Sequence, residues 1–497
     1  MADDTHQYSF LDPLRRYVPL LAWLIAILVI LFVPLKIISY GYLPGDDALR
    51  HAAKAVSGKS WSEILILNPV YKMDHEFGWN WLLTNIHAWE NWNAENLVIF
   101  SVVSLFVLVN IAGLIWLKRP EAWVAAMLAA MVLAVIPMRF TLGRPYLITL
   151  ACLITILYLW RTHRGTPPKA PSLILMIVLA AVSTFFHGAW YLWALPIAAF
   201  FLAMEFSWGI ALGICWLVGV FIGSLLTGHP IEYPIQALQL AFLAVGAHET
   251  QRTMASELQP FSGDALTLAV FGGLLLLRPL MKLNSVPLAR DPAFWLVCMS
   301  WMLGFKVSRF WVDWGWPALM VLIAWDLQLL MESRMAADSL KRLLLVCVLA
   351  VAAYLGITSD FNSRWSGALT QAYLEESNPD LKGWMPGKGG VFYTVDMSLF
   401  YQTFFKNPQG DWRYMLGFEP TWMPKEDFDI YHKILWNFND GKAYQPWIDQ
   451  MTRADRLAVR GAGNGTPDIP GLEWKYAVSG IWLGRLPQTN SVPSGKQ

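Results

Sequence analysis

The sequence has few charged residues and few cysteines for its length. Only 15% of its 497 residues are Asp, Glu, Lys or Arg, whereas soluble domains have about 25%. Hydrophobic residues make up 56% of the chain, and the mean hydropathy is +0.41. These values exclude an ordinary soluble protein and predict a polytopic membrane protein. A net charge of +1 and the lack of a basic tail give no reason to expect nucleic acid as a partner.

The number and positions of the four cysteines argue against a cysteine-based metal site. They lie inside apolar runs and share no spacing typical of a metal motif, so we interpret them as small buried hydrophobic residues: Cys152, Cys215, Cys298 and Cys347. The chain has no GxGxxG or Walker sequence, which argues against a nucleotide fold. We predict no cofactor; the residues leave a divalent metal open, and we do not predict one. The 27 tryptophans are abundant by contrast, and many lie near the ends of apolar runs, as interfacial anchoring would have it.

Long apolar runs follow one another along the first 357 residues. A spanning helix needs about 20 apolar residues. We predict about eleven spans, at residues 17–39, 96–117, 121–138, 146–160, 171–187, 189–205, 207–227, 265–281, 292–305, 312–331 and 342–357. The first run is long and lacks a small-residue cleavage site, so no cleavable signal is expected.

Lys and Arg gather in alternate loops, which predicts the orientation. Basic residues mark one side at positions 15–16, 118–119, 161–169, 278–290 and 334–342, and this side should be cytoplasmic. The loops 40–95, 138–145, 228–264 and 306–311, and everything after about residue 358, are then outside. We expect a multi-pass protein of the bacterial inner (plasma) membrane, with a cytoplasmic N-terminus.

The tail, residues 358–497, is polar and punctuated by Pro and Gly. Strand-like runs at 390–396, 412–418 and 456–461 alternate with helix-like stretches at 397–405 and 425–438. This alternation predicts a small extracytoplasmic α/β domain. We expect a membrane domain over 1–357, including the outer loop 40–95, and a separate tail domain over 358–497.

Paired acids follow the first span in 44-PGDDALRH-51. Asp46 or Asp47 can act as a general base, because low solvation and a like-charged neighbour make a carboxylate a better proton acceptor. The same letters are good helix-start chemistry, so the pair can also be an N-cap. Both interpretations can hold together.

A second polar group, Asp74, His75 and Glu76, lies in the same outer loop within 72-KMDHEFGWNW-81. It can supply an acid, a metal ligand or an acceptor contact. Its spacing matches no standard metal motif, and a solvated turn at the membrane surface explains it nearly as well.

Cationic residues on the outer side run against the positive-inside bias. Arg139 and Arg144 lie in 137-PMRFTLGRPYL-147, and Lys306 and Arg309 lie in 305-FKVSRFWVDWGWP-317. A guanidinium suits phosphate binding, and two outer cationic pairs suggest one anionic ligand between them. Snorkelling at a helix end is the alternative for the arginines, and an i, i+4 salt bridge to Asp313 is the alternative for Arg309.

Four further residues are weaker candidates for substrate binding: His187, His248, Glu249 and Arg252. A lone His at an apolar helix end is more often a satisfied structural group than a site residue. Polar side chains at membrane depth are nonetheless usually functional.

These features together resemble the GT-C superfamily of membrane glycosyltransferases. The order is a first span, an outer loop that begins with paired acids, a surface helix, outer arginines, many more spans and an outer α/β domain. The superfamily includes protein O-mannosyltransferases, lipid A aminoarabinose transferases and oligosaccharyltransferase catalytic subunits. Its first-loop acid matches Asp46-Asp47, and its outer phosphate-binding cations match Arg144 in 143-GRPY-146 and Arg309 in 308-SRF-310. Arg139 and Lys306 match less securely, and the peptide-binding signature of the oligosaccharyltransferases is absent.

The resemblance implies transfer of a sugar from a polyprenyl-phosphate donor to a lipid, glycan or protein acceptor on the outer face. Cations would hold the donor phosphate, and Asp46 or Asp47 would activate the acceptor hydroxyl, so attack would invert the anomeric carbon. The partners implied are the donor, membrane lipid and the acceptor.

Three other functions are compatible with the residues. A transporter or flippase of a lipid-linked or anionic solute would use the intramembrane charges as a path, but related halves are not visible. A non-catalytic envelope assembly protein would use the tail as a binding module. A ligase or polymerase of lipid-linked glycans would need a longer, Arg-rich outer loop than 228–264.

Overall fold

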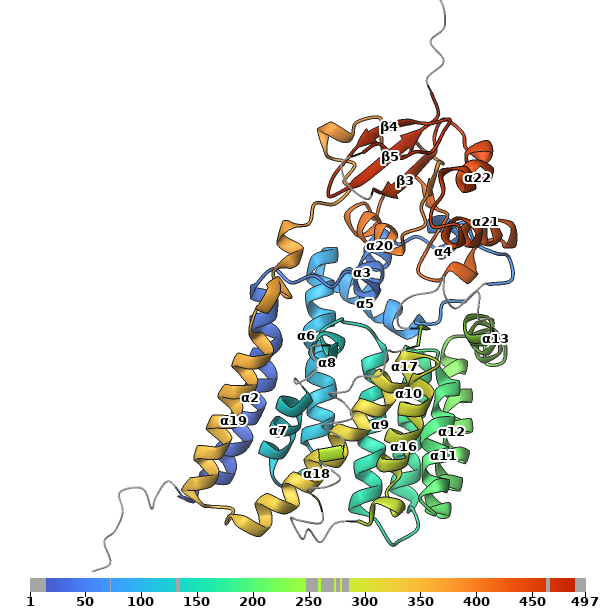
Figure 1. Ribbon diagram of the computed structural model, residues 1–497. Helices are drawn as coiled ribbons and strands as arrows, with labels where there is room; N and C mark the ends of the chain where they lie inside the picture. The colour runs from blue at the N-terminus through green and yellow to red at the C-terminus, as the bar shows by residue number, and fades with distance from the viewer. Residues whose placement is uncertain are drawn as a thin grey trace, which may run out of the picture. The chain divides into compact units, whose positions relative to one another are not determined.

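The computed structural model describes residues 15–71, 73–130, 135–246, 258–260, 272–273, 278, 286–461 and 465–487 (Figure 1). His248, Glu249 and Arg252 lie outside the described residues, and so does nearly all of the predicted span at 265–281. Contacts divide the chain into two compact units. The membrane unit comprises Met1–Leu43, Ile99–Ile235 and Glu257–Gly367, and the loop–tail unit comprises Pro44–Val98, Gln236–Ser256 and Ala368–Gln497.

The membrane unit is helical, and its helices lie close to the apolar runs of the sequence. They are α2 (Val18–Ser39), α6 (Ala94–Leu114), α7 (Pro120–Ala130), α8 (Val135–Phe140), α9 (Tyr146–Thr162), α10 (Ala170–Phe186), η1 (Trp190–Trp193), α11 (Ala194–Leu202), α12 (Phe206–Leu226), α16 (Pro292–Gly304), α17 (Ser308–Phe310), η4 (Trp311–Gly315), α18 (Trp316–Arg334) and α19 (Leu340–Thr358). Five helices of the described chain are long and apolar enough to span a membrane, and further apolar helices are shorter. A multi-pass helical protein is confirmed, and the number eleven stays a prediction.

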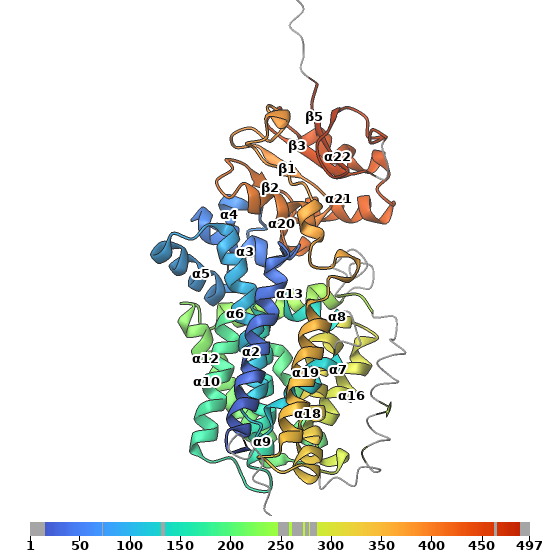
Figure 2. The same ribbon diagram turned by 90° about the vertical axis from the view of Figure 1, so that its left-hand side faces the viewer.

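Helix α9 is the central helix of the membrane unit, because every residue from Tyr146 to Ile154 is buried. Around it, α10 packs on α12 and α2 packs on α19 (Figures 1 and 2). Small residues allow the α10–α12 approach. A Cβ on Gly219 would lie 2.5 Å from that of Ala180, and one on Gly223 would lie 2.6 Å from the Ala181 carbonyl oxygen. Close backbone contact of this kind is how helices associate in lipid.

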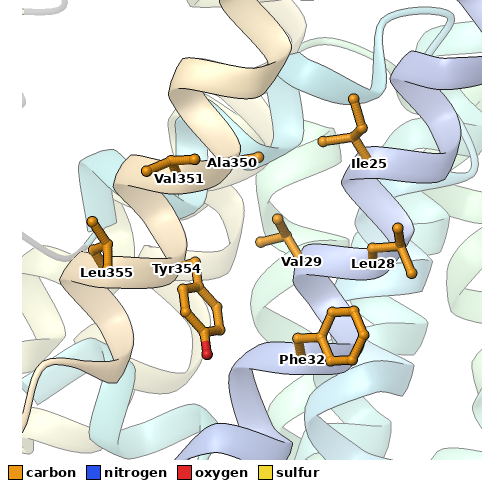
Figure 3. Close-up of a pocket in the computed structure, with 8 residues that line it drawn as sticks. All are labelled: Ile25, Leu28, Val29, Phe32, Ala350, Val351, Tyr354 and Leu355. Atoms are coloured by element: carbon orange, nitrogen blue, oxygen red, sulfur yellow. The ribbon is translucent and has the colours of Figure 1, made fainter.

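An apolar groove of about 360 Å³ runs between α2 and α19 (Figure 3). Ile25 and Phe32 line it from α2, and Val351 and Tyr354 line it from α19. Its walls are hydrocarbon side chains apart from the tyrosine, so it accepts apolar groups such as lipid chains.

The loop–tail unit combines three helices of the first loop with the tail. The loop helices are α3 (Asp47–Ser57), α4 (Trp61–Ile64) and α5 (Phe77–Glu90). The main tail elements are β1 (Val391–Tyr393), α20 (Met397–Lys406), β2 (Arg413–Tyr414), α21 (Lys425–Trp436), η9 (Gly441–Tyr444), α22 (Gln445–Gln450), β3 (Arg456–Arg460), β4 (Glu473–Tyr476) and β5 (Ile481–Arg485). The predicted strands and helices are present; the strands and α21 are shorter than predicted, and α20 is one residue longer. No sequence pattern predicted α22, β4 or β5, and α13 (Glu232–Gly246) is a helix in a segment predicted as loop.

The five strands form one mixed sheet in the order β2-β1-β3-β5-β4; Figure 2 labels β1, β2, β3 and β5, and Figure 1 labels β4 beside β5. β1 pairs in parallel with β2 and β3, whereas β5 is antiparallel to both β3 and β4. Neighbouring residues of β1 face opposite sides, as strand geometry requires. Phe392 contacts Tyr414, which packs on Phe400 of α20, while Tyr393 packs on Trp447 of α22. Helices therefore cover both faces, which confirms a small α/β domain.

The first loop packs directly on this sheet. Leu65 forms a parallel bridge with Tyr414, and the Ile66 amide donates to the Tyr414 carbonyl oxygen at 2.9 Å. The Lys59 ammonium donates to the Gly410 carbonyl oxygen at 2.6 Å. The loop thus covers the β2 edge, which would otherwise present unpaired backbone groups. Its contacts group the loop with the tail, and the division into domains at residues 357 and 358 stays a prediction.

Candidate active site

The membrane unit brings two of the four predicted outer cations together, Arg139 at the end of α8 and Arg309 in α17. Arg139 lies at the end of α8, and Gly143 turns the chain with a φ of +65°. A side chain there would be strained, and its Cβ would approach the Val102 backbone nitrogen to 3.1 Å. The turn leads into α9, whose burial gives Arg139 a fixed support. The Tyr146 hydroxyl donates to the Arg139 carbonyl oxygen at 2.7 Å.

Asp313 is the centre of this group, which we call the arginine cluster. Arg139 Nη2 donates to both carboxylate oxygens of Asp313, at 2.7 and 2.9 Å, and Arg139 Nε donates to Oδ1 at 3.0 Å. Arg309 Nε donates to Oδ2 at 3.0 Å, so the i, i+4 pair predicted from the sequence is present. Asp313 lies in the π-helical turn η4, and such turns shift side chains out of helical register, often at functional sites.

His187 extends the cluster towards α9 and α10. Its Nε2 lies 3.5 Å from Arg309 Nη2, and its Nδ1 lies 3.3 Å from the Thr149 hydroxyl. Thr149 in turn lies 2.9 Å from the Ser183 hydroxyl, which accepts from Trp193 Nε1 at 2.9 Å. His187 is therefore placed beside Arg309 rather than isolated in an apolar helix end. No pattern in the sequence pointed to Thr149 or Ser183.

The arginine cluster has the chemistry of an anion site. Two guanidiniums from separate segments bind one carboxylate, His187 lies beside one of them, and the Arg309 side chain is still 25% exposed. Guanidinium forks match phosphate oxygens well. Arg144 lies four residues beyond the end of α8 and is half-buried, while Lys306 is exposed. Their roles in substrate binding stay predictions.

The loop–tail unit holds a second group, the acidic cluster, which joins the two acid motifs of the first loop. Arg50 Nε donates to Asp47 at 2.8 Å, and Arg50 Nη2 donates to Glu76 at 3.1 Å. The Arg50 side chain is only 2% exposed. Asp47 and Glu76 are thus held by one buried guanidinium, a relationship that the i, i+3 spacing of Asp47 and Arg50 could have suggested.

Asp74 organises the other half of the acidic cluster. It accepts hydrogen bonds from Trp61 Nε1 at 2.8 Å, from the Glu76 amide at 3.1 Å and from the Asn80 side-chain amide. Because Asn80 Nδ2 donates to Asp74, its Oδ1 accepts, at 2.7 Å, from Nδ1–H of His51. A line of hydrogen bonds therefore runs from His51 through Asn80 to Asp74 and fixes the tautomer of the imidazole.

Burial sets the ionisation of these groups. Burial alone would lower the pKa of Arg50, but Asp47 and Glu76 raise the pKa above its ordinary value. Burial, reinforced by Asp74 and Asp47, raises the pKa of Glu76, although Arg50 opposes the shift. Burial and then Arg50 lower the pKa of His51 to about 3. Burial also lowers the pKa of His75 to about 4, so both imidazoles are neutral near pH 7.

The tail forms one wall of the acidic cluster. The Arg50 guanidinium lies 3.8 Å from the centre of the Phe418 ring, and the His75 ring meets Trp422 edge-on at 5.8 Å. His75 Nε2 also lies 3.3 Å from the amide nitrogen of Gln236. The sequence indicated no part for the tail here, because Phe418 and Trp422 look like ordinary core residues.

Asp46 occupies the N-cap position of α3, but its side chain makes no capping hydrogen bond. Capping therefore does not account for its carboxylate. Within the described part of the chain, no group of three or more His, Cys, Asp or Glu side chains is arranged to hold a metal ion. Our expectation of a metal-independent site stays a prediction.

Comparison with known proteins finds a similarity of fold. No family model matches the chain, and no curated protein matches its sequence. Among solved structures, the chain is similar to the arabinofuranosyltransferase AftD from Mycobacteria, with 13% identity and a TM-score of 0.50. The match covers 95% of this chain, which spans 40% of the length of AftD. The comparison therefore shows that the fold of this chain is similar to that of AftD.

Proposed function

We propose that the protein is a GT-C-type glycosyltransferase that moves a sugar from a polyprenyl-phosphate donor to an acceptor on the outer face of the membrane. The observation that carries the proposal is that Arg139 and Arg309 both bind Asp313, with His187 beside Arg309. A fold shared with a membrane glycosyltransferase supports it. The apolar helices place the cluster in a membrane protein, where a phosphate on a lipid is the natural anion.

The arginine cluster would bind the donor phosphate. Arg309, more exposed than Arg139, would contact the phosphate oxygens, while Asp313 and Arg139 fix its position. As the bond between the anomeric carbon and the phosphate oxygen breaks, its electron pair passes to that oxygen. Cations placed in advance stabilise the charge that develops there, and such electrostatic stabilisation usually contributes more to catalysis than any other effect.

The acidic cluster would supply the base. A carboxylate of Asp46 or Asp47 takes the proton of the acceptor hydroxyl, and the acceptor oxygen forms the new bond to the anomeric carbon with inversion. Asp47 is bound by Arg50, which orients it. Asp46 lies next to it at the N-cap position of α3, and either carboxylate can be the proton acceptor. Arg144 and Lys306 would contribute charge near the donor.

The location follows from the same proposal. We infer a bacterial inner membrane with a cytoplasmic N-terminus and a periplasmic or extracellular tail, since lipid-linked sugars are consumed on that side by enzymes of this fold class. The acceptor is a glycan, a lipid or a protein, and the mechanism needs no nucleotide or nucleic acid.

The test uses host cells that express Asp46→Asn, Asp47→Asn or Arg309→Ala in place of the wild-type protein, each at normal membrane abundance. Arg290→Ala is the matched control, because Arg290 is exposed and belongs to neither cluster. Mass spectrometry compares lipid-linked sugars and envelope glycans. We expect one polyprenyl-phosphate sugar to accumulate while one glycan or glycoprotein loses a residue. Unchanged pools in all three variants would refute the proposal and favour a transporter or an assembly protein.

A further inference from the structure

The end of α21, in the loop–tail unit, carries an aromatic side chain that the fold does not use. Phe438 follows the helix and is 95% exposed. Trp436, two residues earlier, is 46% exposed. Single exposed apolar residues are common, so exposure alone assigns nothing to Phe438.

The backbone of Phe438 makes its identity unusual. The amide of Asn439 donates to the Ile434 carbonyl oxygen at 2.9 Å, and that of Phe438 donates to the Leu435 carbonyl oxygen at 3.2 Å. This pair of bonds is a Schellman motif, in which glycine normally occupies the position of Phe438. Its φ is +53°, a region that a bulky side chain enters only at a cost. The chain uses glycine where α3 ends, at Gly58 with a φ of +64°.

Phe438 therefore carries two costs, a left-handed backbone and a ring in water. Replacement by glycine would remove both. Nothing in the described fold compensates for these two costs. We therefore infer that the Phe438 ring contacts a partner, because an observed backbone outlier supports a hypothesis of function.

The surroundings indicate what this contact is. His432 and Trp436 stack with ring centres 5.8 Å apart and planes 17° from parallel, which holds the indole as a flat, fixed surface. Asn437 and Asn439 flank Phe438, are exposed, and have no side-chain hydrogen bond among the described residues. Sugars offer both complements: C–H faces that stack on electron-rich rings, and hydroxyls that pair with side-chain amides.

Charge argues against a lipid surface as the occupant. Residues 425–442 contain three lysines and four carboxylates, a balance of −1, whereas helices that bind anionic membranes are rich in Lys and Arg. The exposed amides and the small aromatic area fit an uncharged, hydroxyl-rich ligand better than an apolar protein interface.

We propose that Trp436, Asn437, Phe438 and Asn439 form a saccharide-binding subsite, the α21 platform, which holds the acceptor glycan. This inference rests on the proposed function and narrows its acceptor to a carbohydrate chain. Sugar rings stack on Trp436 and Phe438, while the two amides bind hydroxyls. The platform would raise the local concentration of the acceptor without taking part in bond formation.

The test uses the full-length protein in nanodiscs and neutral hexasaccharides of arabinofuranose, mannose and glucose as probes. Wild type should retain at least one of the three, and Phe438→Gly should weaken retention about tenfold, as loss of a central aromatic contact does. The same variant should melt at a higher temperature than wild type, because glycine suits the left-handed backbone. Lost binding in a more stable protein cannot be attributed to misfolding.

Met204 provides the matched control. It is 68% exposed and has a φ of +60°, but it lies at the end of α11 in the membrane unit. Met204→Gly should relieve the same backbone strain and leave retention of the glycan unchanged. Retention by Phe438→Gly equal to wild type, or no retention of any hexasaccharide by wild type, would overturn the proposal and assign the platform to a lipid or protein partner.

The two proposals fail separately. If the protein transfers sugar and Phe438→Gly changes neither glycan retention nor the acceptor KM, the platform is wrong and the transferase stands. If the protein retains glycan through Phe438 but the Asp46, Asp47 and Arg309 variants change no sugar pool, the platform stands as a glycan-binding surface and the transferase is wrong.

Discussion

Arg139 and Asp313 form a forked ion pair between segments that are 174 residues apart in the sequence, with their closest atoms 2.7 Å apart. Both side chains are nearly buried, at 11% and 5% exposure. The pair ties the α8–α9 turn to the π-helical turn before α18. It also orients the carboxylate that Arg309 shares, so the geometry of the arginine cluster depends on a long-range contact.

This dependence can be measured by a double-mutant cycle. Asp313→Asn should lower the melting temperature of the detergent-solubilised protein, because two guanidiniums are left facing each other without a compensating charge. Arg139→Gln should also destabilise it. The double variant should lose less than the sum of the two single losses, with a coupling of about 1 kcal/mol or more. Strictly additive losses would show that the pair contributes no stability of its own.

Arg50 should matter more for stability than either acid it binds. Arg50→Ala leaves Asp47 and Glu76 close together without their shared cation, and removal of one partner of a buried ion pair costs about 3–5 kcal/mol. Asp47→Asn keeps the shape and leaves Arg50 bound to Glu76, so its cost should be about 1–2 kcal/mol. Thermal unfolding in detergent measures both. Arg413→Ala, at an exposed position of β2, is the control and should change little. Equal losses for Arg50→Ala and Asp47→Asn would contradict the arrangement.

The helices of the membrane unit were largely predictable, because hydropathy and length constrain a membrane span strongly. The run expected at 17–39 is the helix Val18–Ser39, and the run at 342–357 is Leu340–Thr358. The tail was less predictable. β4 reads EWKY and is only partly buried, so it lacks the alternation by which a strand is recognised.

The contacts of the candidate sites were also only partly predictable from the sequence. Local spacing predicted the Arg309–Asp313 pair, because residues four apart meet on one helix face. No local rule could add Arg139 to that pair, or join Glu76 to Asp47 through Arg50, because these contacts depend on tertiary packing. His51 and Asn80 were not predicted for a similar reason. They are 29 residues apart, and nothing in the sequence indicates that their side chains form a hydrogen bond.

Acid should destabilise the loop–tail unit. The folded-state pKa values of His51 and His75, about 3 and about 4, lie below the ordinary value of 6.5. The unfolded chain therefore binds more protons, and stability is lost as the pH falls below about 6.5. The fully buried His51 imidazole contributes about 1.4 kcal/mol per pH unit in this range, and the partly exposed His75 contributes less. The raised pKa of Glu76 acts in the opposite direction.

Melting temperatures at pH 7 and pH 5 test this prediction. His51→Asn keeps a donor for Asn80 near the position of Nδ1 and removes the titrating ring, so it should reduce the loss between the two pH values by about 2 kcal/mol. His163→Asn is the control, because His163 is exposed and lies in the membrane unit. If the melting temperature of His51→Asn fell between pH 7 and pH 5 as much as that of wild type, a group other than His51 would cause the acid sensitivity.

Gly315 should be needed to hold Asp313 in place. A Cβ on Gly315 would lie 2.4 Å from the buried Trp311 ring and 3.1 Å from the Ser300 Cβ. Gly315→Ala must therefore displace Trp311 or unwind the π-helical turn, and either movement shifts Asp313 away from Arg139 and Arg309. Overpacking of this kind costs about 1–3 kcal/mol. Sugar transfer should fall as well, because the cations lose their shared anchor. Gly213→Ala is the matched control, since a Cβ there meets nothing within 4 Å. Normal sugar transfer by Gly315→Ala would contradict this prediction. It would mean that Arg309 keeps its position without the Asp313 carboxylate.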